Sequence, residues 1–316
     1  MILGVAYGGP SPVVAAVRAG VLLRTWQGSS GTAGAAFGVP ARVWRSARAA
    51  CVAMDLEQAP RARVAVIRIG GPCPPSLGPP GGSGVATIVR GGHSLTGRQL
   101  APLDTEAVRS FAAGCGLARF AVTAVGSPVT SDHELAAAEV VAAAVPGARI
   151  TLSYEFSRAG LREREDTAVL NAALGPEAWR LADEIERELP GLPLYFARSA
   201  GGLVSAHYFR RYPLVCYRGL SAGAARGDEA QGPMVAAAYG AALAGPAAEV
   251  ERIVLARGRA ELDRALREAR EEALTRVVSA GAVPGSAHIS SSTVNPLSYL
   301  PDGLYRVRVT ADGATP

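Results

Sequence analysis

The sequence predicts an α/β protein with a mixed sheet flanked by helices. Two observations predict this class. Short apolar runs of strand length recur between Gly- and Pro-rich turns, and longer segments carry apolar residues at helical spacing. With 316 residues, of which 49% are hydrophobic and 19% charged, the chain is long enough for one large domain or two modest ones.

Charge and residue usage exclude several kinds of chemistry. The formal net charge is +5, and no lysine occurs, so every basic residue is an arginine. The arginines alternate with Glu and Asp, as in 257–276, which is typical of solvated helix faces, so we expect no nucleic-acid partner. Without lysine the chain cannot form a Schiff base or place a P-loop lysine on a phosphate.

The cysteine spacing and the length of the apolar runs indicate the cellular compartment in which the protein is expected. The cysteines show no Cys-x-x-Cys spacing, which predicts neither a metal cluster nor a disulfide framework and fits a reducing compartment. They are Cys51, Cys73, Cys115 and Cys216. The N-terminus lacks the regions of a signal peptide, and no run approaches the roughly 18 apolar residues that span a bilayer. We expect a cytoplasmic protein with no membrane partner.

In the first third of the chain the pattern predicts mainly strands. The pair Ala19-Gly20 is expected to form the turn of a hairpin. Strands are expected at 2–7, 13–17, 21–26, 63–69 and 85–89, with a Pro- and Gly-rich loop at 70–84. The segment 41–56 is predicted to be an amphipathic helix, with one apolar face formed by Val43, Ala47, Ala50 and Met54.

The rest of the chain is predicted to alternate strands and helices. Asp104 fits the N-cap of one helix, and the acidic residues of 131–134 open another that runs to 144. Strands are predicted at 120–125, 150–152 and 194–197, and helices from about 166 to 174, at 177–189 and at 260–280. Gly281 fits the end of the last helix as its C-cap.

The stretch 150–174 organises the candidate chemistry. A strand, a charged connection at 154–165 and a helix follow one another, and α/β folds usually place their working residues in such connections. The stretch also resembles the segment S-x-E … E-R-x-x-T-x-x-L-N-A of the A-type subunits of the hydantoinase/oxoprolinase family. The matching residues are Ser153, Glu155, Glu163, Arg164, Thr167, Leu170, Asn171 and Ala172.

The resemblance extends over nearly the whole chain. Further matching positions are Gly91, Gly92, His93, Ser127, His133, Glu134, 199–205 and 296–301. It implies an actin-like (ribonuclease-H-like) hydantoinase A fold with a mixed sheet flanked by helices. We expect an N-terminal-like α/β domain at 1–230 and a C-terminal helix and strand segment at 231–316 that packs on it.

The phosphate motifs that the resemblance implies are degenerate in this sequence. The family's first motif reads D-x-G-G-T-x-T-D, and here only Gly8-Gly9 match, while Ala6, Pro10 and Val13 replace oxygen-bearing residues. A magnesium-phosphate site needs such oxygens, so we do not expect ATP as a cofactor. From residue 227 onward no second motif follows, so we expect the fold to lack its second nucleotide-binding block.

Four residues are the candidates for catalysis. Glu163 beside Arg164 can orient an amide or carboxylate substrate, and Asn171 in the following helix adds a hydrogen-bond donor. His93 completes the set, because it follows a strand end. The alternative interpretation is an ion-pair network that fixes the loop.

Substrate-binding and metal candidates come from other segments. Ser199, Gly201 and Gly202 could offer backbone N–H groups to an oxyanion or carboxylate, or form a tight strand-to-helix turn. Glu155 joins them as a substrate-binding candidate. His133 and Glu134, with His93 nearby, are candidates for a divalent metal. The alternative is that Asp132 and Glu134 cap the helix while His133 is a half-exposed surface residue.

The resemblance implies an activity on cyclic amides such as hydantoins or oxoproline, often with ATP and a B-type partner subunit. We expect an enzyme that acts on a cyclic amide, lactam or related acyl substrate without ATP. The alternatives are a non-catalytic subunit that pairs with a B-type partner, and a repurposed biosynthetic enzyme. Loss of a block exposes core surface, so a homo-oligomer is expected.

Overall fold

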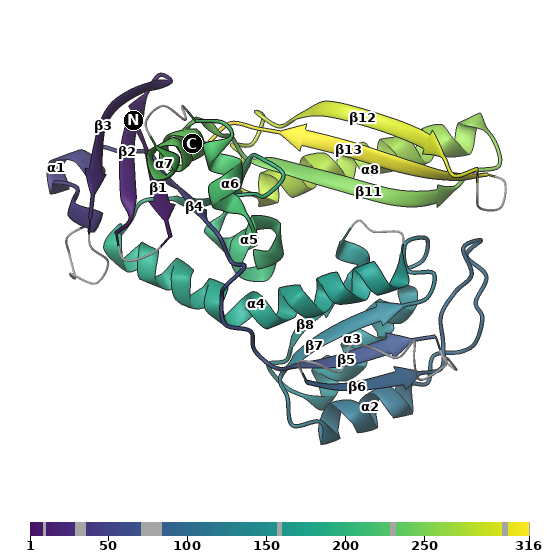
Figure 1. The fold of residues 1–316 in the computed structure, drawn as a ribbon. Helices are drawn as coiled ribbons and strands as arrows, with labels where there is room; N and C mark the ends of the chain where they lie inside the picture. The colour runs from purple at the N-terminus through teal and green to yellow at the C-terminus, as the bar shows by residue number, and fades with distance from the viewer. Residues whose placement is uncertain are drawn as a thin grey trace.

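The strands of the chain form three sheets flanked by helices (Figure 1). The structure is a computed structural model that describes residues 1–8, 11–28, 36–70, 84–156, 160–227, 232–298 and 303–315. Within these residues the sheets have six, four and three strands. The predicted α/β class with a mixed sheet is therefore confirmed.

The six-stranded sheet contains the N-terminus and is mixed. Its order is β10-β9-β4-β1-β2-β3, in which β1 pairs antiparallel with β2 and parallel with β4. The strands are β1 (Ile2–Tyr7), β2 (Val13–Arg18), β3 (Val21–Gln27), β4 (Ala49–Met54), β9 (Leu194–Ala197) and β10 (Leu203–Ser205). The predicted β2–β3 hairpin turns at Ala19 and Gly20, both with positive φ, as such tight turns require.

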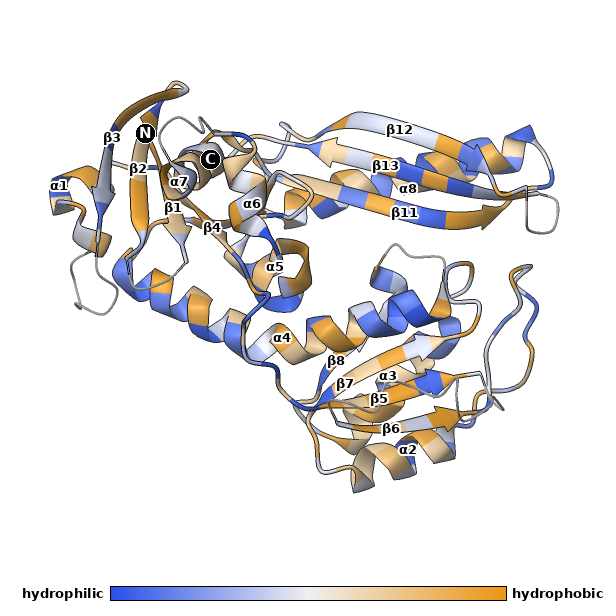
Figure 2. Cartoon of the chain, viewed as in Figure 1, coloured by the Kyte–Doolittle hydropathy of each residue, from blue (hydrophilic) through white to orange (hydrophobic). Residues whose placement is uncertain are grey.

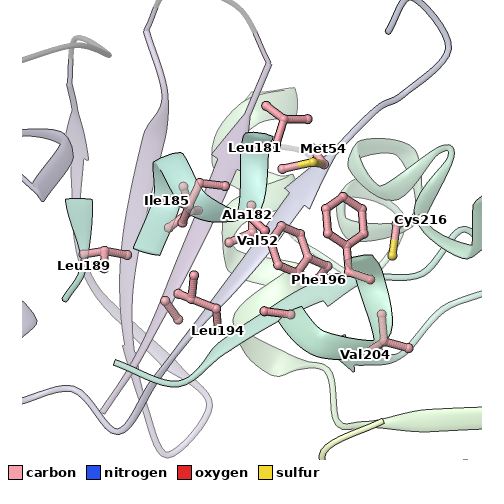
Figure 3. Packing of buried hydrophobic residues seen from close by; sticks show 14 of the residues in the cluster. Val52, Met54, Leu181, Ala182, Ile185, Leu189, Leu194, Phe196, Val204 and Cys216 are labelled. Atoms are coloured by element: carbon pink, nitrogen blue, oxygen red, sulfur yellow. The ribbon is translucent and has the colours of Figure 1, made fainter. Parts of the chain in front are cut away.

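Both faces of this sheet are buried at β1, β2, β4 and β9. The second half of α4 (Leu161–Glu188) covers one face, where Leu181 and Ile185 pack against Val52 and Phe196 (Figure 3). Helix α7 (Pro233–Leu243) covers the other, where alanines meet alanines. Figure 2 shows β2 mostly in orange, the hydrophobic colour, as expected for a strand between two layers.

The helix predicted over 41–56 is wrong, because 49–54 is the central strand β4. Only α1 (Ala41–Trp44) is helical there. In β4 the larger side chains of Val52 and Met54 face α4, while Cys51 and Ala53 face α7. The run therefore alternates in side-chain size with period two, and burial on both faces overrides the helix propensity of alanine.

The second sheet is parallel and has four strands. Its order is β6-β5-β7-β8, with helices α2 and α3 on one face and the first half of α4 on the other. The elements are β5 (Val64–Ile69), β6 (Gly84–Val89), α2 (Thr105–Gly114), β7 (Arg119–Ala124), α3 (Asp132–Ala144) and β8 (Arg149–Leu152). Asp104 caps α2 as predicted, accepting a hydrogen bond from the Ala107 N–H at 3.0 Å.

Helix α4 is one helix of 28 residues where the sequence predicted a charged loop and two helices. At a rise of 1.5 Å per residue it is about 42 Å long, and it links the six-stranded and four-stranded sheets (Figure 1). Gly175 precedes Pro176 and has no Cβ to meet the proline ring. Because each half buries its apolar stripe on a different sheet, the helix continues through the proline.

The third sheet is antiparallel, in the order β11-β13-β12, and carries helix α8 on one face. Its elements are β11 (Ala247–Leu255), α8 (Arg259–Ser279), β12 (His288–Pro296) and β13 (Leu304–Asp312). Ala269, Ala273 and Val277 of α8 lie in this core, and Gly281 follows the helix end with φ of 102°. Shorter elements are η1 (Ala36–Gly38), η3 (Ser153–Glu155), α5 (Ala206–Arg211), η4 (Pro213–Cys216) and α6 (Gly219–Ala224).

Several predictions lie outside the described residues: Gly9, Pro10, Cys73, most of the loop at 70–84, and 299–301 of the last matching segment. The proposed division of the chain at residue 230 also stays a prediction. Helix α7, just after it, packs on β1, β2 and β4. No helix among the described residues is long and apolar enough to cross a membrane.

Candidate functional site

The parallel sheet has a topological switch point between β5 and β7. The chain runs from β5 to β6 on one side and then returns to β7 on the other side of β5. In α/β sheets, ligands bind beyond the carboxyl ends of the strands at such a point. Here the connections approach closely: a Cβ at Gly126 would lie 2.2 Å from the carbonyl oxygen of His93.

Two histidines meet at this switch point. The rings of His93 and His133 lie 4.3 Å apart between centroids, and both side chains are buried. The Gly92 N–H donates to His133 Nδ1 at 2.8 Å, while Nδ1 of His93 has no hydrogen-bond partner within the described part of the chain. Burial, and then the neighbouring His93 ring, lower the pKa of His133, so this ring is neutral near pH 7.

Glu134 is fully buried and surrounded by donors. Its carboxylate accepts from the backbone N–H groups of Ala124 at 2.9 Å and Tyr154 at 3.1 Å, and from Ser153 Oγ at 2.6 Å. Burial raises the pKa of the Glu134 carboxyl, and these hydrogen bonds oppose the rise. The residue therefore fastens α3 to the ends of β7 and β8.

Arg164 lies in the first turn of α4 and is 2% exposed. Its Nη2 donates to the Ala124 carbonyl at 2.9 Å, and its Nε points at Ser153 Oγ at 3.4 Å. Burial lowers the pKa of the guanidinium, while the Glu134 carboxylate opposes that shift. The arginine, the serine and the glutamate thus form one buried polar network, which we call the switch-point network.

A second buried charge pair, which the sequence reasoning missed, supports this network. Arg68 on β5 donates from Nε to Glu165 Oε1 at 2.9 Å and from Nη2 to Glu165 Oε2, a bidentate pair. Both side chains are buried. An arginine inside the apolar strand VAVIRI, opposite a helix that carries adjacent charges, was the available signal.

A cleft of about 500 Å³ opens beside Arg164. The switch-point side supplies Ser127, Ser131, Tyr154 and Arg164. The facing side is the edge of the third sheet and its helix, with lining residues 251–255, Glu261, Arg264, Ala265 and Glu268. The Ser127 side chain is buried. Hydroxyls, a buried guanidinium and carboxylates therefore surround one space.

The structure separates the four catalytic candidates. Arg164 lines the cleft, but Glu163, the residue before it, is exposed on the other side of the helix turn. Asn171 is buried two turns away, where it holds the segment after α5 through the Arg211 carbonyl at 3.1 Å and the Leu214 N–H at 3.3 Å. His93 lies with His133 and does not line the cleft.

The substrate-binding candidates also lie apart from the cleft. Ser199, Gly201 and Gly202 form the turn of the β9–β10 hairpin, so this turn joins two strands and not a strand and a helix. The Ser199 N–H donates to the Val215 carbonyl, and the Gly201 N–H donates to that of Arg198. Glu155 accepts from Arg211 at 2.9 Å and Tyr212 at 2.7 Å.

The metal candidates are partly brought together. His93 and His133 meet, but the Glu134 carboxylate is turned to the donors of β7 and η3. Among the described residues no group of three or more His, Cys, Asp or Glu side chains could hold a metal ion. A metal role for His133 and Glu134 stays a prediction.

The arrangement of sheets and helices defines the class of fold, an α/β fold that two solved proteins share. An ATP-dependent caprolactamase from Pseudomonas jessenii shares it, with a TM-score of 0.59 and 18% identity over 71% of this chain and 39% of that one. A nucleotide-free acetone carboxylase shares it with a TM-score of 0.56 and 12% identity, over 74% and 41%.

At these identities the likeness shows the fold alone. The chain spans about two fifths of the length of either protein. No protein-family model and no curated protein matches the sequence.

Proposed function

We propose that the protein binds a cyclic amide, a lactam or a related acyl compound in the cleft beside Arg164 and hydrolyses its C–N bond without ATP. The observation that carries the proposal is the position of Arg164, a buried guanidinium fixed by its neighbours at the wall of a polar cleft. A fixed guanidinium can hold a carbonyl or carboxylate oxygen in one orientation, at little cost in side-chain entropy.

The other wall of the cleft complements this group. Glu261 and Glu268 on α8 place carboxylates on the same space, and these can accept a hydrogen bond from a ring N–H. Ser127 and Tyr154 add hydroxyls between them. The amide of such a ring presents one acceptor, the carbonyl oxygen, and one donor, the N–H, so a guanidinium and a carboxylate that line one cleft complement it.

The independence from ATP is supported by the N-terminal hairpin. Ala6 on β1 and Val13 on β2, which replace the acidic positions of the family's motif, are register partners. Both are buried in the cluster formed with α7, beside Leu220 and Met234. A methyl and an isopropyl group under an apolar layer offer no oxygen to magnesium or phosphate.

The test uses the purified full chain with hydantoin, 5-oxoproline and caprolactam. Binding is measured calorimetrically and ring opening by chromatography, each with and without ATP-Mg²⁺. We expect binding without nucleotide, and a loss of about tenfold or more in Arg164→Lys, which keeps the charge but not the planar fork. Arg162→Lys, an exposed neighbour on the same helix, is the matched control. Turnover that requires ATP, or equal losses in both variants, contradicts the proposal.

A second candidate function is a non-catalytic subunit that pairs with a B-type partner. It is favoured by β3, an edge strand of the six-stranded sheet that exposes Val21 at 61% and Leu23 at 52%. Exposed apolar edge strands are rare unless another chain covers them. Co-elution with a B-type subunit that Leu23→Lys abolishes, together with no ligand in the cleft, would favour this function.

A further inference from the structure

A second cavity, of about 490 Å³, lies at the opposite end of the parallel sheet. It is lined by the first residues of β7 and β8, by the middle of α4 and by α5, and it shares no lining residue with the cleft beside Arg164. Its charged lining side chains are all basic: Arg119, Arg149, Arg210 and Arg211, with His207 beside them. We call it the arginine pocket.

Two of these arginines are neighbours, and no acidic side chain among the described residues pairs with either. Arg119 and Arg149 are register partners on adjacent parallel strands, so their side chains lie side by side. Arg210 pairs with Asp183 and Glu186, and Arg211 pairs with Glu155. Among the described residues neither Arg119 nor Arg149 has an ion pair. Like charges directly opposite each other on a sheet are destabilising.

The surroundings keep both guanidinium groups in place. Arg149 and Arg210 each lie over the ring of Trp179, at 5.3 and 5.2 Å from its centroid. Gly175 faces Arg119, since a Cβ there would lie 3.0 Å from Arg119 Nη1. Burial, and then the neighbouring Arg149, lower the pKa of Arg119, so the charged form is held at a cost. The pocket therefore holds two positive charges that an anionic ligand can neutralise.

We propose that the arginine pocket binds a phosphate monoester. Two uncompensated guanidinium groups match the charge of a phosphate dianion, and their forks match its oxygens. The volume exceeds that of phosphate alone, and Ile150, Ala172 and Trp179 line the remaining space, which suits an apolar or aromatic body on the ester. The proposal does not depend on the function of the cleft beside Arg164.

The test measures binding of inorganic phosphate, phenyl phosphate and benzoate by calorimetry at constant ionic strength. We expect saturable binding, tightest for phenyl phosphate and weaker for benzoate, which carries one charge. Arg149→Gln, at an exposed position, should weaken phenyl phosphate binding about tenfold or more. Arg42→Gln removes the same charge from an exposed site on α1 and should leave the affinity within about twofold.

A further variant separates geometry from net charge. Arg149→Lys keeps every charge but lacks the planar fork, so it should weaken phenyl phosphate binding several-fold while circular dichroism shows an intact fold. Three results would overturn the proposal: no saturable binding of either phosphate probe at 10 mM (about the weakest affinity worth assigning to a site), benzoate binding as tightly as phenyl phosphate, or equal losses in Arg42→Gln and Arg149→Gln.

Discussion

Arg164 and Glu165 are consecutive residues of α4. Both side chains are buried and charged, and they interact with different partners. Arg164 reaches the end of β7 and Ser153, whereas Glu165 pairs with Arg68 on β5. Desolvation of such groups is compensated only while every partner is present. The first turns of α4 are therefore fixed by polar contacts as much as by packing, and this fixes the guanidinium at the cleft.

The bidentate pair of Arg68 and Glu165 leads to a prediction about the stability of the fold. Glu165→Ala leaves Arg68 buried without its carboxylate, so we expect a loss of about 3–5 kcal/mol in the free energy of unfolding, measured by urea denaturation. Glu106→Ala removes the carboxylate of the exposed pair with Arg109, and a much smaller change is expected there. Similar losses in the two variants would show that the buried pair contributes no more to the free energy of unfolding than the exposed pair does.

At the scale of elements, the contact between β1 and α7 is a contact between backbones. A Cβ at Gly4 would lie 1.7 Å from the carbonyl oxygen of Ala238. Small residues on β1, β2 and β4 and alanines on α7 make this approach possible. The same approach decides the conformation of 49–54, because only a strand presents small side chains to α7 and large ones to α4 at once.

Gly4→Ala tests this packing. The added methyl group must displace the backbone of α7, so we expect a loss of at least about 1–3 kcal/mol in the free energy of unfolding and a lower midpoint in thermal melts. Gly114→Ala in α2, where a Cβ meets nothing within 4 Å, should be neutral or slightly stabilising. An unchanged melt for Gly4→Ala would contradict the close approach of α7.

At the scale of the whole molecule, α4 packs against both the six-stranded and the four-stranded sheet (Figure 1). The third sheet and α8 line the side of the cleft that faces the switch point. The cleft is thus formed by segments more than 80 residues apart in sequence, Arg164 and 251–255 among them. Binding there depends on the relative position of the second and third sheets, and not only on the residues that touch the ligand.

Association is expected at the edge strand β3. Val21 and Leu23 are exposed on a seven-residue strand whose outer edge pairs with no other described strand. We predict a homodimer in sedimentation velocity that shifts toward monomer in Leu23→Lys, because a charge on an edge strand blocks pairing. Leu100→Lys, which alters an equally exposed leucine elsewhere, is the control. A wild-type monomer at all concentrations would contradict the prediction.

Much of the fold and part of the site could be predicted from local pattern. Short apolar runs of strand length marked β1, β5 and β7, the helical stripe marked α8, and Asp104 and Gly281 marked helix ends. Strand ends placed His93 near His133, and the charged segment before residue 166 contained Arg164. Asn171, Glu155 and the turn at Ser199 were identified by their residue types, but in the structure they hold neighbouring segments together.

The sequence by itself determined the α/β class, most strand positions and the absence of lysine chemistry, because these follow from local periodicity and composition. Tertiary structure alone decided that 49–54 is a strand, that α4 continues through Pro176, and that Arg119 lies beside Arg149. Each of these depends on contacts between segments distant in sequence: layers on both faces of β4, two sheets under α4, and the register of β7 with β8. Such contacts outweigh local propensity, which differs by less than about 1 kcal/mol per residue among most residue types.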